Sequence, residues 1–228
     1  MADELKSWDG RPLDWRNKAT DRFVLRWIKR CLSAPVSLWL NRVPGVRPWM
    51  ATAASAVAGT AAGVVLALGH GWQAGLVAAA AQILDGVDGQ LARLKGASGP
   101  RGAYVDSVVD RVVDAALVLG TVIYLARTPL AYRFYLPVVL AFGFVAVVAS
   151  SLVSYSGARA GELGLKLPAK PTLASKGTRT AVIVLCALAT ALWKHAPLVA
   201  LAYLAVHPAA AVINRVARTR NAGGQSKT

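Results

Sequence analysis

Four aspartates in two closely spaced pairs are the residues with the clearest potential for chemistry. Asp85 and Asp88 are three residues apart, and Asp106 and Asp110 are four apart. If each pair lies on a helix, its two carboxylates share one face. A carboxylate inside an apolar helix costs on the order of 3 kcal/mol, so several together need a cation, a basic partner or water. Four converging carboxylates would form an oxygen-ligand site that suits Mg²⁺ or Mn²⁺, with Ca²⁺ as a further acceptable ion.

The residues between the aspartates indicate what such a metal would bind. Gly89 and Ala92 leave one helix face small, so a ligand can approach the backbone closely. Arg93 adds a planar fork of N–H donors that fits a phosphate group. A metal site beside an arginine and a small-residue surface predicts a diphosphate ligand.

The composition shows which elements must position these residues. Hydrophobic residues make up 55% of the 228 residues and charged residues only 16%, and the mean hydropathy is +0.45. These values predict an all-α integral membrane protein. We predict six membrane-spanning helices, at about residues 49–69, 72–94, 102–126, 134–158, 177–194 and 196–215. Gly96, Gly99 and Pro100 make a short connection between the second and third spans, which brings the two aspartate pairs opposite one another.

The segment before the first span has the pattern of a helix at the membrane surface. Phe23, Trp27 and Cys31 recur at four-residue spacing, and basic residues occupy the other faces. A basic run that only sets orientation is the alternative interpretation. The predicted organisation is a polar tail at 1–18, an interfacial amphipathic helix at 19–47, a six-span domain at 48–216 and a polar tail at 217–228.

The net charge of +15 raises the question of nucleic-acid binding, but the basic residues are sorted by membrane side. Of the 26 Lys and Arg residues, only Arg127, Arg133 and Lys194 fall on the side opposite the rest. The positive-inside rule then predicts an even number of spans, with both termini and the aspartate site in the cytoplasm. We expect a multi-pass protein of the inner (plasma) membrane that binds no nucleic acid.

The aspartate region resembles the CDP-alcohol phosphotransferase family. The stretch DGVDGQLARLKGASGPRGAYVDSVVD fits the family signature D-x2-D-G-x2-A-R-x8-G-x3-D-x3-D at every fixed position. These positions are Asp85, Asp88, Gly89, Ala92, Arg93, Gly102, Asp106 and Asp110. The resemblance implies an enzyme that moves a phospho-alcohol group from a CDP-alcohol to a second alcohol and releases CMP. It also implies a homodimer.

The same resemblance implies a role for each matching residue. Asp85, Asp88 and Asp106 would be metal ligands, while Asp110 would complete the metal site and act as the catalytic base. The residues expected to contact the cytidine diphosphate are Thr52, Asp88, Gly89, Ala92, Arg93 and Gly102. Thr52 ends the segment that matches a P-N-x-x-T element of the family, in which Trp49 replaces the usual Asn.

A basic connection after the fourth span is a candidate pocket for an anionic acceptor. The residues that would form it are Ser154, Arg159, Lys170, Lys176 and Arg179. A solvated charge run that only sets topology is the other interpretation.

The identity of the two substrates stays open between two branches of phospholipid and inositol phosphate synthesis. Ser154 to Arg159 resembles phosphatidylinositol phosphate synthases, but Gly157 stands where they carry Lys, and SKGTR replaces their E-R-x-E-R element. The N-terminal segment and SKGTR are more similar to the transferase domains of di-myo-inositol phosphate phosphate synthases, which implies CDP-inositol and inositol phosphate as substrates. A CDP-diacylglycerol-dependent phosphatidyltransferase, of the phosphatidylinositol phosphate or phosphatidylglycerol phosphate type, is the alternative.

A cation transporter is the alternative function from a different class of protein. It would use the carboxylates as an ion path, but it would not need Gly89, Ala92 and Gly102, and Arg93 beside the path would oppose it. A purely structural role would instead pair the carboxylates with nearby arginines. We expect such a pairing for Asp114, one turn beyond Asp110, which should hold Arg111.

Overall fold

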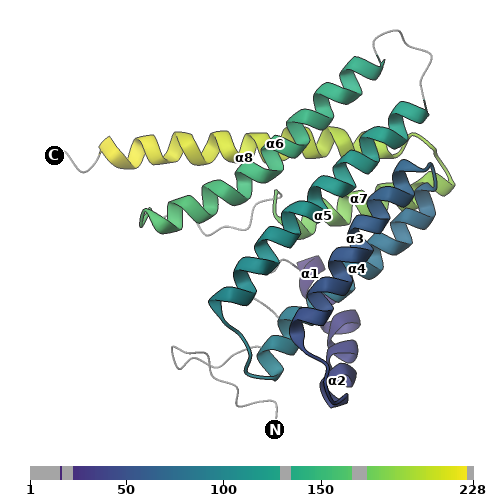
Figure 1. Cartoon of the computed structure of the whole chain (residues 1–228). Helices are drawn as coiled ribbons and strands as arrows, with labels where there is room; N and C mark the ends of the chain where they lie inside the picture. Colours follow the sequence, from purple (N-terminus) through teal and green to yellow (C-terminus); the bar gives the residue numbers. More distant parts are fainter. Residues whose placement is uncertain (1–15, 17–22, 129–134, 166–173, 225–228) are drawn as a thin grey trace.

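The computed structural model describes residue 16 and residues 23–128, 135–165 and 174–224. Within these ranges all regular elements are helical (Figure 1). They are α1 (Phe23–Ile28), the π-helical turn η1 (Lys29–Ser33), α2 (Ala34–Arg42), α3 (Pro48–Ala67), α4 (Gly71–Leu94), α5 (Pro100–Arg127), α6 (Tyr135–Glu162), α7 (Lys176–Leu188), the short 3₁₀ turn η2 (Ala189–Ala191) and α8 (Pro197–Gly224).

The helices α3 to α8 begin close to the starts of the six predicted spans, but two of them end elsewhere. Helix α7 stops at Leu188 and is followed by η2, and α8 continues to Gly224, so the described part of the predicted polar tail from residue 217 is helical. Among the described helices, three have the length and hydropathy of membrane spans: Pro48–Ala67, Tyr135–Glu162 and Pro197–Arg218. Of the remaining helices among α3 to α8, α4 and α5 carry the aspartates of the site, and α7 has only 13 residues. The count of six spans therefore stays a prediction.

Small residues allow α3 to pack closely against α5. Gly63 of α3 lies against the backbone of Ala116 and Leu117, and Gly120 of α5 lies against the backbone of Gly63. A Cβ atom on either glycine would overlap the facing backbone. Such close approach is typical of helices in lipid, where apolar burial does not drive association. Helix α3 also packs along α4, so α3, α4 and α5 form one three-helix unit (Figure 1).

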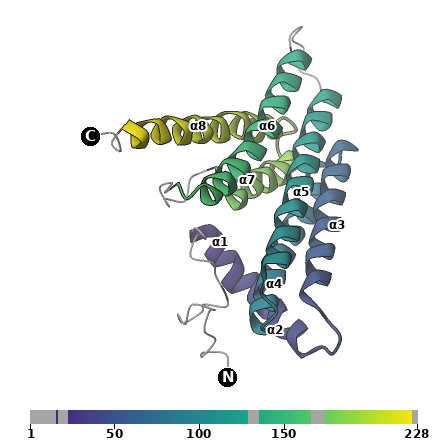
Figure 2. The same cartoon turned by 60° about the vertical axis from the view of Figure 1, so that its left-hand side comes forward.

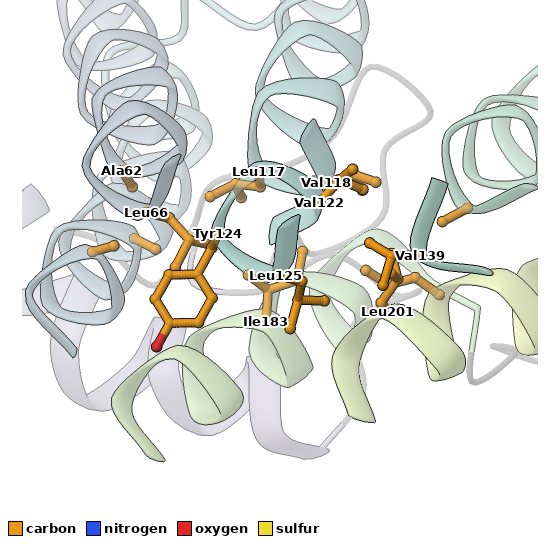
Figure 3. Close-up of a cluster of buried hydrophobic side chains, with 14 of the residues drawn as sticks. Ala62, Leu66, Leu117, Val118, Val122, Tyr124, Leu125, Val139, Ile183 and Leu201 are labelled. Carbon is orange, nitrogen blue, oxygen red and sulfur yellow. The ribbon is translucent and has the colours of Figure 1, made fainter. Parts of the chain in front are cut away.

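One cluster of buried aliphatic side chains joins this unit to the other helices. Leu66, Leu117, Ile183 and Leu201 come from α3, α5, α7 and α8, and all are almost fully buried. Figure 3 shows these side chains and Tyr124 filling the space between the helices. Helices α6 and α8 pack on each other, and the C-terminal end of α8 extends away from the bundle (Figures 1 and 2). The shared core fixes the relative positions of α4, α5 and α7, the helices that carry the site.

The predicted interfacial helix at 19–47 is helical over Phe23–Arg42, in three consecutive parts. The π-helical turn ends at Ser33, two residues before Pro35, whose ring would clash with the carbonyl of residue 31 in a regular α-helix. The wider turn instead pairs the N–H of Ala34 with the carbonyl of Lys29. After Arg42 the chain turns through Gly45, whose φ of 83° favours glycine, toward Pro48 at the start of α3. The turn η1 and helix α2 pack against α4, and Figure 2 shows α2 beside the end of that helix.

Candidate active site

Three of the four predicted metal ligands converge in the structure. The short connection from Lys95 to Gly99, with Gly96 at φ 61°, leads from α4 into α5, and both helices pack against α3. Asp85, Asp88 and Asp106 each offer a carboxylate oxygen, and these oxygens lie within 4.8 Å of one another. Three carboxylates at this spacing suit a hard divalent cation such as Mg²⁺, Mn²⁺ or Ca²⁺. The donor set therefore fits the predicted metal.

Side chains from α3 and α4 orient two of these carboxylates. Thr52 Oγ1 donates a hydrogen bond of 2.8 Å to Asp88 Oδ2, and Gln82 Nε2 approaches Asp85 Oδ2 at 3.4 Å. Asp88 is buried, with 7% of its surface exposed. Thr52, which the sequence predicts as a nucleotide contact, thus contacts one of the three clustered carboxylates.

Asp110, predicted as the fourth ligand and the base, is held by Lys176. The Lys176 ammonium donates to Asp110 Oδ1 and also, at 2.6 Å, to Asp85 Oδ1. Lys176 is the first residue of α7, so its side chain ties that helix to α4 and α5 together. The side chains of Lys176, Asp85 and Asp110 line a pocket between α3, α4, α5 and α7. Its lining residues are Ser55, Gly59, Ala78, Ala81, Gln82, Asp85, Val109, Asp110, Val113, Leu117, Lys176 and Thr180.

A second ion-paired group lies one helical turn further along α5. Arg179 is 2% exposed; it donates to the Ala174 carbonyl at 2.6 Å and to the Asp114 carboxylate. Arg111 pairs with the same carboxylate at 3.2 Å, which confirms the predicted Arg111–Asp114 contact. Arg179 thus points into the protein, against α5 and the connection before α7.

Of the other predicted acceptor-pocket residues, the structure describes Arg159 and Ser154, both on α6. Arg159 is exposed and pairs at 2.7 Å with Glu162 on its own helix. Ser154 is half-buried on α6. Lys170 lies outside the described residues. The structure therefore joins two of the five to the aspartates, and an acceptor pocket made of all five stays a prediction.

At the two glycines of the predicted diphosphate surface, an added Cβ would meet either the Arg93 side chain or no nearby atom. On α4 the Arg93 guanidinium lies over Gly89, where an added Cβ would be 3.4 Å from Arg93 Nη1. Gly102 near the start of α5 is exposed, and an added Cβ there would meet no atom within 4 Å. Ala92 on α4 is half-buried. A ligand phosphate can therefore approach the helix backbone next to Arg93.

The sequence prediction missed a polar contact on the other face of α4. Gln90 is fully buried and bonds to the segment before α3, through Ser37 and backbone carbonyls. The sequence offered one indication of this contact: Gln90 is a polar residue on a face of α4 that should otherwise be apolar.

Comparison with known proteins identifies relatives of most of the chain. Residues 45–214 match the family model described as CDP-alcohol phosphatidyltransferase. A "Bifunctional IPC transferase and DIPP synthase" of Rubrobacter xylanophilus is 33% identical over 80% of this chain and 40% of its own length. A protein of the same description from Thermococcus kodakarensis is 32% identical over 61% of this chain and 30% of its own length.

A third curated relative is the "Archaetidylinositol phosphate synthase" of Pyrococcus horikoshii, 31% identical over 50% of this chain and 55% of its own length. The matches thus span only about a third to a half of each of these three relatives. Among solved structures, the phosphatidylinositol phosphate synthase of Mycobacterium tuberculosis with CDP-DAG bound shares the fold, with a TM-score of 0.69, 24% identity, and coverage of 82% of this chain and 92% of that one. Its complex with manganese and citrate gives a TM-score of 0.69 and 25% identity over 81% and 87% of the two chains.

Proposed function

Because the chain belongs to the CDP-alcohol phosphatidyltransferase family, we propose that it transfers a phospho-alcohol group from a CDP-alcohol to a second alcohol and releases CMP. The observation that carries this proposal is the convergence of Asp85, Asp88 and Asp106 within 4.8 Å, with Asp110 and the Arg93 surface beside them. The family match favours this enzyme over a cation transporter.

Most of the residues proposed to act in the reaction lie on α4 and α5. A bound divalent metal would neutralise the diphosphate and the departing CMP; Asp85, Asp88 and Asp106 would hold it, with Asp110 as the proposed fourth ligand. Gly89, Ala92 and Gly102 leave room for the nucleotide, and Arg93 donates to its phosphates. Thr52 fixes the orientation of Asp88.

Proton transfer is assigned to Asp110 on the facing helix. The acceptor hydroxyl gives its proton to the Asp110 carboxylate, the acceptor oxygen forms a bond to the phosphorus of the phospho-alcohol group, and the bond from that phosphorus to the CMP oxygen breaks. Lys176 holds the Asp110 carboxylate beside Asp85 and is near enough to the reacting groups to attract an anionic acceptor.

The proposed substrates are CDP-inositol and inositol phosphate, as in a di-myo-inositol phosphate phosphate synthase. Two relatives whose descriptions include DIPP synthase support this assignment. A CDP-diacylglycerol donor is the second candidate, supported by the solved relative with CDP-DAG bound. Mn²⁺ or Mg²⁺ is the proposed ion, and the manganese complex of that relative supports a divalent metal.

We further propose a six-span homodimer in the inner (plasma) membrane, with both termini and the active site in the cytoplasm. Three helices with the properties of membrane spans support the membrane location. The interfacial helix and the acceptor pocket of Ser154, Arg159, Lys170, Lys176 and Arg179 belong to the same proposal.

The decisive experiment follows CMP release by the purified protein with Mg²⁺ or Mn²⁺ and a panel of CDP-alcohols and acceptors. CDP-inositol with inositol phosphate should give the fastest release, and CDP-diacylglycerol with inositol phosphate is the comparison. The Asp85→Asn variant is the inactive control. Absence of CMP with every pair, together with absence of cytidine nucleotide binding, would overturn the proposal.

A further inference from the structure

A buried polar junction connects the rear face of α4 to the chain before α3. Gln90 has no exposed surface. Its Nε2 donates to the carbonyls of Arg16 and Lys29, each at 2.9 Å, and its Oε1 accepts from Ser37 Oγ at 2.7 Å. Both amide N–H groups of this side chain are thus used, and all three partners belong to one segment, residue 16 and residues 23–42, here called the N-terminal segment.

A second contact lies one turn earlier on the same face. Ser33 Oγ donates to the Ile83 carbonyl at 2.9 Å. Gly86 lies directly under Ser33, and an added Cβ there would be 3.0 Å from Ser33 Cβ and closer still to Ser33 Oγ. Ile83, Gly86 and Gln90 follow one another at spacings of three and four residues, so they form one stripe along α4.

The junction and the metal ligands occupy opposite faces of the same two turns. Gln90 follows Asp88 by two residues, which rotates it by about 200° around the helix. A rotation of α4 that turned Asp85 and Asp88 away from Asp106 would therefore break the three hydrogen bonds of Gln90. Hydrogen bonds are directional, so this junction fixes the rotation of α4 more narrowly than apolar packing would.

The partners of Gln90 lie outside the part of the chain that the family model matches. That match begins at residue 45, whereas Arg16, Lys29 and Ser37 precede it. The π-helical turn of Lys29–Ser33 lies at the junction, and π-helical turns are frequent at functional positions. Lys29 contributes its carbonyl to both the Ala34 N–H and Gln90.

We propose that the N-terminal segment is a positioning element of the active site, and that Gln90 is the positioning residue through which it sets the orientation of Asp85 and Asp88. The reaction it serves rests on the proposed function. The predicted effect of Gln90 on metal binding does not depend on the proposed function, because it needs only the carboxylates of Asp85, Asp88 and Asp106.

The test compares Gln90→Leu with Gln73→Leu, a matched change at a half-buried position near the other end of α4. Mn²⁺ affinity is measured on each folded, purified protein by electron paramagnetic resonance, together with its thermal stability. Gln90→Leu should weaken Mn²⁺ binding by roughly tenfold or more, the effect usual for residues that orient metal ligands. Gln73→Leu should leave the affinity unchanged. A Gln90→Leu protein that loses thermal stability but binds Mn²⁺ as the wild type does would make the junction merely structural and overturn the proposal.

Two milder variants decide the question if Gln90→Leu does not fold. Ser37→Ala removes one of the three hydrogen bonds and should lower Mn²⁺ affinity in the same direction. Gly86→Ala places a methyl group where it would overlap Ser33, so it should push the N-terminal segment away from α4 although alanine favours helix over glycine. A loss of Mn²⁺ affinity in Gly86→Ala supports the proposal, and wild-type affinity in both variants contradicts it. If the wild type releases no CMP from any substrate while these affinity changes appear, the proposed function fails and the positioning role stands.

Discussion

At the level of single residues, the site places a lysine where two carboxylates from different helices would otherwise repel each other. The Lys176 ammonium contacts both Asp85 and Asp110. Because Asp85 is also part of the three-carboxylate group, Lys176 and a divalent cation attract the same side chain. Substitution of Asp110 should therefore affect turnover, whereas substitution of Lys176 should affect metal affinity.

The Asp110→Asn variant should lose turnover while it still binds metal, because Asp85, Asp88 and Asp106 remain and the Asn amide oxygen can serve as the fourth ligand. The amide cannot accept the acceptor proton, and loss of a general base typically lowers the rate by about 10²–10⁴-fold. CMP release measures turnover, and Mn²⁺ binding to Asp85, Asp88 and Asp106 is the control. Near-normal turnover with bound metal and nucleotide would assign the base to another residue.

The Lys176→Met variant should bind Mn²⁺ more tightly than the wild type. Methionine has a similar length and no charge, so it removes the ammonium that competes for Asp85. A hydrogen bond between charged groups contributes about 1.5–3 kcal/mol, so a gain of roughly tenfold in affinity is expected. Isothermal titration with Mn²⁺ measures it, with the exposed Lys95→Met as the matched control. Equal or weaker binding in Lys176→Met would show that Lys176 does not compete with metal.

The sequence predicted the aspartate group from local spacing, because both pairs lie on helices joined by a short turn. It placed Lys176 and Arg179 in an acceptor pocket rather than on carboxylates. Their partners Asp85, Asp110 and Asp114 lie 65 to 91 residues away in the chain. Side-chain pairing over such separations depends on which helix packs where, and one sequence carries no signal for it.

At the level of elements, α7 is held in register against α5 by two consecutive ion pairs. Lys176 and Arg179 are three residues apart on α7, and they meet Asp110 and Asp114, four apart on α5. Neighbours at these spacings lie on one helix face. A shift of α7 along α5 would break both pairs together.

Removal of Arg179 should strongly destabilise the protein. Arg179→Leu leaves Asp114 buried with only Arg111 beside it, and breaking a buried pair costs about 3–5 kcal/mol. The exposed Arg159–Glu162 pair gives the control, since Arg159→Ala should cost about 0–1 kcal/mol. Thermal unfolding in detergent compares the two. If Arg179→Leu is as stable as Arg159→Ala but weakens acceptor binding selectively, Arg179 serves the acceptor pocket without contributing to stability.

The contact of α3 with α5 makes a second prediction at this scale. Gly120→Ala should cost about 1–3 kcal/mol, because its methyl group would overlap the backbone of Gly63 and force the helices apart. Gly161→Ala on α6 is the control, since an added Cβ there meets no atom within 4 Å. Thermal unfolding is again the measurement. Equal stability of the two variants would show that α3 and α5 can separate without cost.

The starts of the helices were predicted well because proline, glycine and the change from polar to apolar residues mark them. Pro48, Pro100 and Pro197 each stand at the first position of a helix. The π-helical turn before Pro35 was not predicted. The sequence there indicates only that a regular helix is disturbed, while the docking of Gln90 on the Lys29 carbonyl depends on the folded arrangement.

At the level of the whole molecule, the distribution of charge predicts the orientation in the membrane. In a background with Cys31 and Cys186 replaced by Ser, Gly99→Cys and Lys194→Cys place single thiols at two exposed positions. In intact cells an impermeant thiol reagent should label Lys194→Cys, and it should reach Gly99→Cys only after permeabilisation. The reverse pattern would mean that the aspartate site faces outward.

The direction of α8 has a practical consequence for work with this protein. Its C-terminal end extends away from α4 and α5 (Figures 1 and 2). A fluorescent reporter or an affinity tag attached after α8 would therefore sit at a distance from the carboxylate group. A tag placed close before Arg16 would instead adjoin the carbonyl that Gln90 binds. A fusion after α8 should thus disturb metal binding less than one placed close before Arg16, and the C-terminal position is the one to choose for purification.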